Sequence, residues 1–288
     1  MITRRQLIQN SVFMAAGCRL ARGWAPATND IRLGAQTNAW PIGRLDTFLG
    51  VLDQIKQLGY AGFETGFLNL RPYFNSPEPA RYSIAGSGLT FFGIHLFLPP
   101  ERWDPATHLP PVPLYQEVAR GGAALGAQRL IFSGAPAPST DDLKRKIAGL
   151  NTAGAFSKSV GLPLAYHNHW WEFQSKIGEI EALYAETDPG LVSFLLDAGH
   201  AYRGGADVPA FLRQHHQRIV ALHLRDYQNG QQVPLGSGTF PLAEVAATLA
   251  HLKWKGWVLN EEEREDGSKL GLKVMEPSFQ ALRKAFPQ

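Results

Sequence analysis

Cysteine is almost absent from this chain of 288 residues, which contains only Cys18. A single thiol excludes an internal disulfide and a site built from several cysteines. Any metal ion that the chain binds must therefore be held by histidine, aspartate or glutamate.

Long apolar runs and surplus positive charge are also scarce. No stretch beyond residue 28 supplies the roughly 20 apolar residues that a membrane-spanning helix needs. The formal net charge is +3, but residues 1–28 contain four arginines and no acid, so the remainder of the chain has a charge of −1. We therefore expect no transmembrane span and no basic surface for nucleic acid.

Residues 1–28 are expected to form an export signal. Arg4 and Arg5 lie in a twin-arginine pattern, and the apolar segment 11–17 that follows is too short to cross a bilayer as a helix. Cleavage after Ala27 and lipid attachment at Cys18 are both open, and the alternative is a disordered basic tail. The prediction is an exported protein, either periplasmic or lipid-anchored outside the cytoplasm.

Residues 29–288 are expected to form one domain, a (β/α)8 TIM barrel. Its length is close to the ~250 residues of such a barrel, and strand-like and helix-like segments alternate throughout. A doubly wound open sheet is the alternative fold. The first strand is not followed by the G-x-G-x-x-G pattern of a nucleotide-binding sheet, and polar residues end nearly every strand, which favours the barrel.

The first half of this domain contains four predicted strands, at 31–36, 60–63, 90–97 and 129–132. Apolar residues at helical spacing follow the first strand from Leu45 until Gly59. Glu64 is expected at the tip of the second strand, and His95 lies in the third. The proline-rich segment 99–111 is expected to cover the barrel mouth, and Ser139 or Thr140 begins a helix.

Four apolar strands in the second half each end in residues that bind metals. They lead into His167, Asp197, His223 and Glu261. The carboxyl ends of parallel barrel strands share one face, so these side chains are expected to hold one divalent ion of the Mn, Co, Fe or Zn type. A polar pocket without a metal is the alternative.

Other residues near the strand ends are assigned roles by their chemistry. Glu261, Glu172 and His169 are candidate catalytic groups. The candidate substrate-binding residues are His200, Arg225, Glu64, His95, Trp40 and Trp170. Asp226 and Asn168 are expected to orient their neighbours, and the tryptophans suit either packing or stacking on a sugar.

From about residue 31 onward, the chain resembles the xylose isomerase-like barrel superfamily, which includes sugar phosphate isomerases and epimerases, inosose dehydratases and apurinic-site endonucleases. The segments that carry the resemblance are Tyr166-His167-Asn168-His169, Leu196-Asp197-Ala198-Gly199-His200, Leu222-His223-Leu224-Arg225-Asp226, Pro234-Leu235-Gly236-Ser237-Gly238 and Trp257-Val258-Leu259-Asn260-Glu261. The resemblance implies a metal-dependent enzyme that acts on a carbohydrate.

One position departs from the epimerase pattern. The resemblance implies metal ligands at Asp197, His223 and Glu261, but His167 stands where the epimerases carry a glutamate. Proton transfer between two glutamates is therefore not implied directly, and Glu172, His167 or His169 would have to supply the second group. The endonuclease branch carries an Asp-x-His pair after the strand-seven histidine, and residues 227–233 contain none.

The expected function is isomerisation or epimerisation of a keto or aldo sugar derivative through a metal-stabilised enediolate. Elimination from the same intermediate, by a dehydratase or lyase acting on keto-sugars or keto-glycosides, is the first alternative. A non-catalytic periplasmic sugar-binding barrel is the second alternative, and a cluster of four ionisable groups argues against it.

Overall fold

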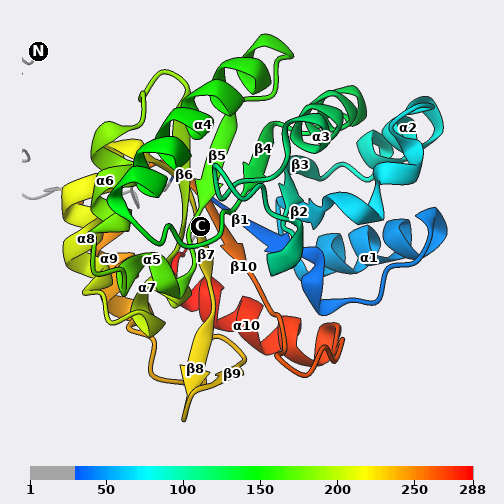
Figure 1. Ribbon diagram of the computed structural model, residues 1–288. Helices are drawn as coiled ribbons and strands as arrows, with labels where there is room; N and C mark the ends of the chain where they lie inside the picture. Colours follow the sequence, from blue (N-terminus) through cyan, green and yellow to red (C-terminus); the bar gives the residue numbers. More distant parts are fainter. Residues whose placement is uncertain (1–29, 288) are drawn as a thin grey trace, which may run out of the picture.

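The computed structural model describes residues 30–287, and within them eight parallel strands close into a barrel (Figure 1). The order around the barrel is β1-β10-β7-β6-β5-β4-β3-β2, as expected for a TIM barrel. The barrel strands are β1 (Ile31–Gln36), β2 (Gly62–Gly66), β3 (Thr90–Leu96), β4 (Arg129–Phe132), β5 (Leu164–His167), β6 (Val192–Asp197), β7 (Ile219–Leu224) and β10 (Gly256–Asn260).

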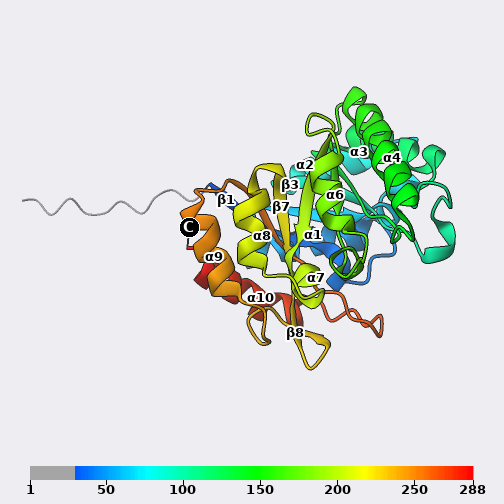
Figure 2. The same ribbon diagram turned by 60° about the vertical axis from the view of Figure 1, so that its left-hand side comes forward.

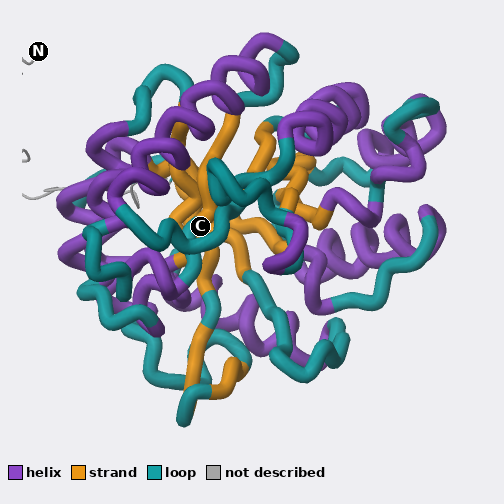
Figure 3. The backbone as a smooth tube through the Cα atoms, in the orientation of Figure 1, coloured by secondary structure: helices purple, strands orange, loops and turns teal. Residues whose placement is uncertain are grey.

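Helices surround the strands on the outside, which Figure 3 shows as a ring of purple around an orange centre. The α-helices are α1 (Leu45–Leu58), α2 (Glu78–Gly86), α3 (Val112–Leu125), α4 (Thr140–Ser159), α5 (Trp170–Phe173), α6 (Glu179–Glu186), α7 (Ala198–Arg203), α8 (Val208–His215), α9 (Leu242–His251) and α10 (Leu272–Ala285). The fold class predicted from the sequence is therefore confirmed.

Local sequence signals account for several helix ends. The buried residues Phe48, Leu52 and Ile55 lie on one face of α1, and the helix ends at Gly59, whose φ of 103° is a left-handed conformation that glycine adopts at little cost. At the start of α4, the Ser139 hydroxyl accepts a hydrogen bond from the Asp142 backbone N–H, as an N-cap does.

The barrel interior is filled by side chains rather than open. Seven buried residues form its inner cluster: Phe92, Ile131, Ala165, Leu195, Ala221, Trp257 and Leu259. A packed interior leaves the carboxyl ends of the strands as the place where polar side chains can gather around a ligand.

Among the strands, the structure adds a hairpin to those predicted. Residues 226–233, for which the sequence predicted no strand, form an antiparallel hairpin of β8 (Asp226–Gln228) and β9 (Gln231–Val233). Figure 2 shows this hairpin projecting beside the barrel, outside the closed sheet. The observed β2 begins at Gly62 and continues to Gly66, later than predicted at both ends, which places Glu64 inside the strand instead of at its tip.

The proline-rich segment does not cover the cavity at the barrel mouth, so that prediction was wrong. None of residues 99–111 lines this cavity, whereas Phe97, just before the segment, does. The segment instead contacts the β4–α4 connection, where the Ala135 N–H donates to the His108 carbonyl, and helix α4, where the Arg145 side chain donates to the Ala106 carbonyl. These hydrogen bonds hold the segment beside α4, and its Trp103 contacts the outer side of the cavity wall, with the ring centre 5.9 Å from that of Phe97.

The predicted export signal, with Arg4, Arg5 and Cys18, lies outside the described residues. Within residues 30–287, no helix has both the length and the apolar character required to cross a membrane.

Candidate metal centre

Four buried side chains meet at the carboxyl ends of four neighbouring strands. His167 ends β5, Asp197 ends β6, His223 lies near the end of β7, and Glu261 directly follows β10. One potential ligand atom from each residue lies within 4.8 Å of those of the other three. The set that the sequence analysis selected for a metal is therefore gathered at one point.

Each histidine of the cluster has one ring nitrogen in contact with a residue outside the cluster. The Nε2 atom of His223 lies 2.9 Å from Glu64 Oε2, and the Nδ1 atom of His167 lies 3.2 Å from the Ser133 hydroxyl. The remaining nitrogens, His223 Nδ1 and His167 Nε2, lie 3.1 Å apart at the centre of the cluster. An outer partner of this kind fixes the ring orientation of a metal-binding histidine.

The two carboxylates are arranged in the same way. Asp197 Oδ1 accepts from the His200 backbone N–H at 2.7 Å, and Glu261 Oε1 accepts from the Asn38 amide at 3.0 Å. The other oxygens, Asp197 Oδ2 and Glu261 Oε2, are buried and accept no hydrogen bond of good geometry. One oxygen of each carboxylate is thus fixed by the protein, and the second faces the cluster.

Arg225 balances the charge of these carboxylates. Its Nε atom lies 2.9 Å from Asp197 Oδ2, and its Nη2 atom forms an ion pair with Glu261 Oε2. The guanidinium is only 3% exposed, so water screens this pairing little.

The same charges shift the pKa values of the cluster. Burial opposes the ionised form of both carboxyl groups, but Arg225 and the neighbouring histidines outweigh it and hold the pKa values of Asp197 and Glu261 well below their usual range. Burial likewise opposes a charged His223, but Glu261 and Glu64 raise its pKa to about 10. Both carboxylates are therefore ionised and available as ligands at neutral pH.

The residues fit a divalent metal ion. Two imidazole nitrogens and two carboxylate oxygens form a ligand set that suits Mn, Fe, Co or Zn. Ligands about 2.0–2.2 Å from an ion lie at most about 4.4 Å from one another, so the observed limit of 4.8 Å requires movements of only a few tenths of an ångström. Asp197 Oδ2 and Glu261 Oε2, which pair with Arg225 but have no well-formed hydrogen bond, are the carboxylate atoms that an ion would bind.

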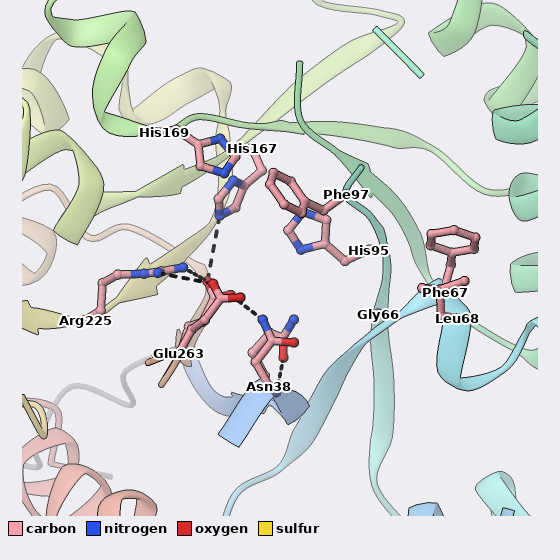
Figure 4. A pocket seen from close by; sticks show the side chains of 12 residues that line it. Asn38, Gly66, Phe67, Leu68, His95, Phe97, His167, His169, Arg225 and Glu263 are labelled. Atoms are coloured by element: carbon pink, nitrogen blue, oxygen red, sulfur yellow. Dashed lines mark hydrogen bonds and ion pairs between the residues drawn. The ribbon is translucent and has the colours of Figure 1, made fainter. Parts of the chain in front are cut away.

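A cavity opens directly beside this cluster (Figure 4). Its volume is about 130 Å³, and His167, Arg225 and Glu261 of the cluster form part of its wall. In Figure 4, His169 and Phe97 lie on one side of this space and Asn38 lies on the other. A small molecule in the cavity would touch the candidate metal ligands.

Several other predicted residues lie where the sequence analysis expected them. His95 and His169 line the cavity, and His200 Nε2 lies 3.9 Å from Asp197 Oδ2. The Asn168 amide pairs with the backbone of Asp197 through two hydrogen bonds of 3.0 Å, which fixes the position of that ligand. Their roles in binding and catalysis stay predictions.

Four of the residues predicted to bind substrate, Glu64, Trp40, Trp170 and His200, do not line the cavity, although His200 lines an adjoining hollow. Glu64 is fully buried behind His223 and His95, so it supports these rings and cannot reach a substrate. The indole N–H of Trp40 donates to Gln54 on α1, at a separate hollow. Trp170 lies beneath the guanidinium of Arg203, 5.8 Å away.

The predicted catalytic role of Glu172 is corrected by its contacts. Its carboxylate accepts from the Tyr166 hydroxyl at 2.7 Å and from the His169 backbone N–H at 2.8 Å, away from the cluster. Burial raises the pKa of Glu172 to about 7, although nearby Lys146 lowers it. Glu172 is therefore a group that holds the loop carrying His169.

Asp226, predicted to orient a neighbour at the site, organises a loop instead. Its carboxylate accepts hydrogen bonds from four backbone N–H groups, those of Tyr227, Gly236, Gly238 and Phe240. These bonds connect the segment that follows the β8–β9 hairpin to the start of β8.

The sequence analysis missed three supporting residues, Asn38, Ser133 and Lys146. Asn38 and Ser133 follow predicted strands, a position that could have indicated them. Lys146 is fully buried in α4, and its ammonium donates to Glu179 at 2.6 Å. Its spacing of three residues from Leu143 places it on the apolar face of the helix, which was the available signal.

The sequence profile of a family described as xylose isomerase-like TIM barrel matches residues 52–284. Among characterised proteins, the inosose dehydratase of Bacillus licheniformis is 28% identical over 159 residues, which cover 49% of this chain and 53% of the dehydratase. The chain thus matches about half the length of such relatives.

Solved structures share the fold over nearly the whole chain. A sugar phosphate isomerase/epimerase from Parabacteroides distasonis has a TM-score of 0.71 at 20% identity, covering 91% of this chain and 96% of that one. A 3-keto-D-glucoside 4-epimerase from E. coli has a TM-score of 0.65 at 15% identity, covering 88% and 98%. At these identities the likeness extends to the fold alone.

Replacing Glu64 with glutamine should weaken metal binding without removing a ligand. The neutral amide accepts the His223 N–H more weakly than a carboxylate does, and its single oxygen cannot serve both His223 and His95. Weakening an outer partner of this kind typically costs about 10- to 100-fold in metal affinity. Calorimetric titration with Mn²⁺ and Zn²⁺ measures the effect, with Asp197→Ala as the ligand-removal reference.

The matched control is Glu117→Gln, since Glu117 is half-exposed and pairs only with Arg71 among the described residues. Affinity for both ions should be unchanged in this variant. Equal affinity in Glu64→Gln and in the unmodified protein would show that Glu64 does not support the metal centre.

Proposed function

The chain belongs to the xylose isomerase-like TIM barrel family, and from this premise we propose that it is a metal-dependent isomerase or epimerase of a keto or aldo sugar derivative. The observation that carries the proposal is the convergence of His167, Asp197, His223 and Glu261 beside a cavity. Clustered ionisable groups in a cavity are typical of catalysis rather than of sugar binding alone.

His167, Asp197, His223 and Glu261 would hold the ion. When bound, a divalent ion supplies Lewis acidity, which polarises a carbonyl oxygen and acidifies the hydrogen on the adjacent carbon. Glu261 lines the cavity and its carboxylate is ionised, so it is the proposed base for that hydrogen; with Oε2 assigned to the ion, Oε1, which accepts from Asn38, is the oxygen left for the proton.

His169 is the proposed group on the opposite side of the substrate. It lines the cavity, and burial together with the nearby histidines lowers its pKa well below the usual value, which keeps the imidazole neutral. A neutral imidazole can exchange a proton through either nitrogen, whereas an imidazolium could only donate one. Glu172 holds the His169 backbone and thereby positions the ring.

A dehydratase or lyase is the second candidate. Removal of the same proton, followed by loss of a β-hydroxyl or β-glycosyl group, would give elimination instead of epimerisation. The similarity to an inosose dehydratase over half the chain favours this alternative.

We also propose that the protein works outside the cytoplasm, in the periplasm or on a lipid anchor at Cys18. The support is the twin-arginine pattern at Arg4 and Arg5 in a segment without acids. In that location, free sugars and keto-glycosides are more suitable substrates than sugar phosphates.

Proton abstraction predicts that product formed in heavy water carries deuterium at the carbon next to the carbonyl. A panel of ketoses and aldoses, incubated with metal-loaded protein and analysed by NMR and mass spectrometry, provides the test. Glu261→Gln should lower turnover by about 10² to 10⁴, the usual cost of removing a positioned base. Metal content is measured in parallel, and Glu117→Gln is again the control.

Three outcomes separate the candidates. Deuterated epimer or isomer supports the proposed reaction, and an unsaturated product lacking water or a glycosyl group supports elimination. Product without deuterium, obtained with several substrates, would contradict proton abstraction and indicate a hydride shift.

Export should depend on the arginine pair. Replacing Arg4 and Arg5 with lysine is expected to leave the protein in the cytoplasm, because twin-arginine transport requires that pair. Immunoblotting of cell fractions from the native host measures this, with Arg19→Lys as the control that keeps the pair. Unchanged fractionation of the double variant would rule out a twin-arginine signal.

A further inference from the structure

A second hollow adjoins the cavity beside the candidate metal ligands, the metal-side cavity. It has a volume of about 280 Å³, and it shares Phe97, His169, Arg225 and Glu263 with the first cavity. The metal-side space of about 130 Å³ is smaller than the roughly 300–1,000 Å³ of most small-molecule sites. The two spaces together reach that range, so the cleft extends beyond a single reacting unit.

Aromatic rings form much of the wall of the second hollow. Trp171 stacks on His169, with the ring centres 4.1 Å apart and the planes 6° from parallel. Phe97 lies 5.3 Å from His169 on the shared wall and is 47% exposed, an unusual position for a large apolar side chain. Flat apolar rings beside polar groups such as Gln232 suit the faces of a sugar ring.

The cations around this hollow already have partners. Arg203 pairs with Glu265 at 3.0 Å, and Arg264 donates to the Gln232 carbonyl and lies 3.3 Å from Glu262. Arg225 is bound to the two carboxylates of the metal centre. A phosphate group would need a cation or a row of free N–H groups, and among the described residues of this hollow each arginine is matched by an acid.

We infer that the second hollow is a subsite for an uncharged glycosyl group, so that the substrate is a glycoside or disaccharide rather than a phosphorylated sugar. The reacting sugar occupies the metal-side cavity, and the second ring lies against Phe97 and Trp171. This inference rests on the proposed function and specifies its substrate class.

A series of sugars that share one reacting unit tests the inference. Binding to metal-loaded protein is measured by calorimetry for fructose, fructose 6-phosphate and the five isomeric glucosyl-fructoses linked at carbons 1, 3, 4, 5 and 6. At least one glucosyl-fructose should bind about tenfold or more tightly than fructose, the scale of one well-packed ring. Fructose 6-phosphate should gain nothing over fructose.

In the variants, we compare the affinity for that disaccharide with the affinity for fructose. The ratio of the two cancels any effect of the substitution on binding of the fructose unit itself. Phe97→Ala and Trp171→Leu should reduce the ratio to near one. Tyr82→Ala should preserve it, because Tyr82 on α2 is 73% exposed and lines neither space.

Tighter binding of fructose 6-phosphate than of fructose would overturn the subsite. So would a disaccharide that still binds more tightly than fructose in both Phe97→Ala and Trp171→Leu. Binding of fructose without any gain from a second ring would also overturn it while leaving the proposed function intact. If no sugar of the series binds although the metal-loaded protein converts another ketose or aldose, the subsite fails and the proposed function stands. Absence of both binding and turnover contradicts both.

Discussion

Asp197 and Glu261 share one buried guanidinium, that of Arg225, and the arrangement of the barrel mouth depends on this pairing. Desolvating an ion costs several kcal/mol, so two carboxylates at this depth require a compensating cation. Gly199 leaves the space for it, since a Cβ atom there would lie 2.2 Å from Arg225 Cγ. A divalent ion at the cluster would take over part of this compensation.

The outer contacts determine which atoms face the cluster. Glu64, Ser133, Asn38 and the His200 backbone each occupy one polar atom of a candidate ligand, and the other polar atom faces the cluster. The site is therefore preorganised by hydrogen bonds from elements far apart in the chain. Such contacts explain why a set of buried, ionisable groups is maintained at one point despite its cost.

The barrel and the four candidate ligands could be predicted from the sequence because both follow from a local pattern. An apolar strand that ends in His167, or in Asp197, brings its polar residue to the common face of a parallel barrel. The family resemblance pointed to three of these ligands, Asp197, His223 and Glu261, and the structure gathers them together with His167.

The supporting residues could not be predicted in the same way, because side-chain direction decides their contacts. Glu64 and Glu172 are both acids near strand ends, yet one lies behind His223 and the other caps the turn of α5. The three-residue spacing from His169 to Glu172 matches a capping box, although histidine is not a usual first member. The direction of the proline-rich segment likewise depends on backbone hydrogen bonds to distant residues.

Anomalous diffraction from crystals of the Mn²⁺-loaded protein tests the metal centre most directly. The expected result is one peak bound by His167 Nε2, Asp197 Oδ2, His223 Nδ1 and Glu261 Oε2, at about 2.0–2.2 Å from its nitrogen and oxygen ligands. A peak elsewhere in the barrel, or no peak with Arg225 still bridging the two carboxylates, would contradict it.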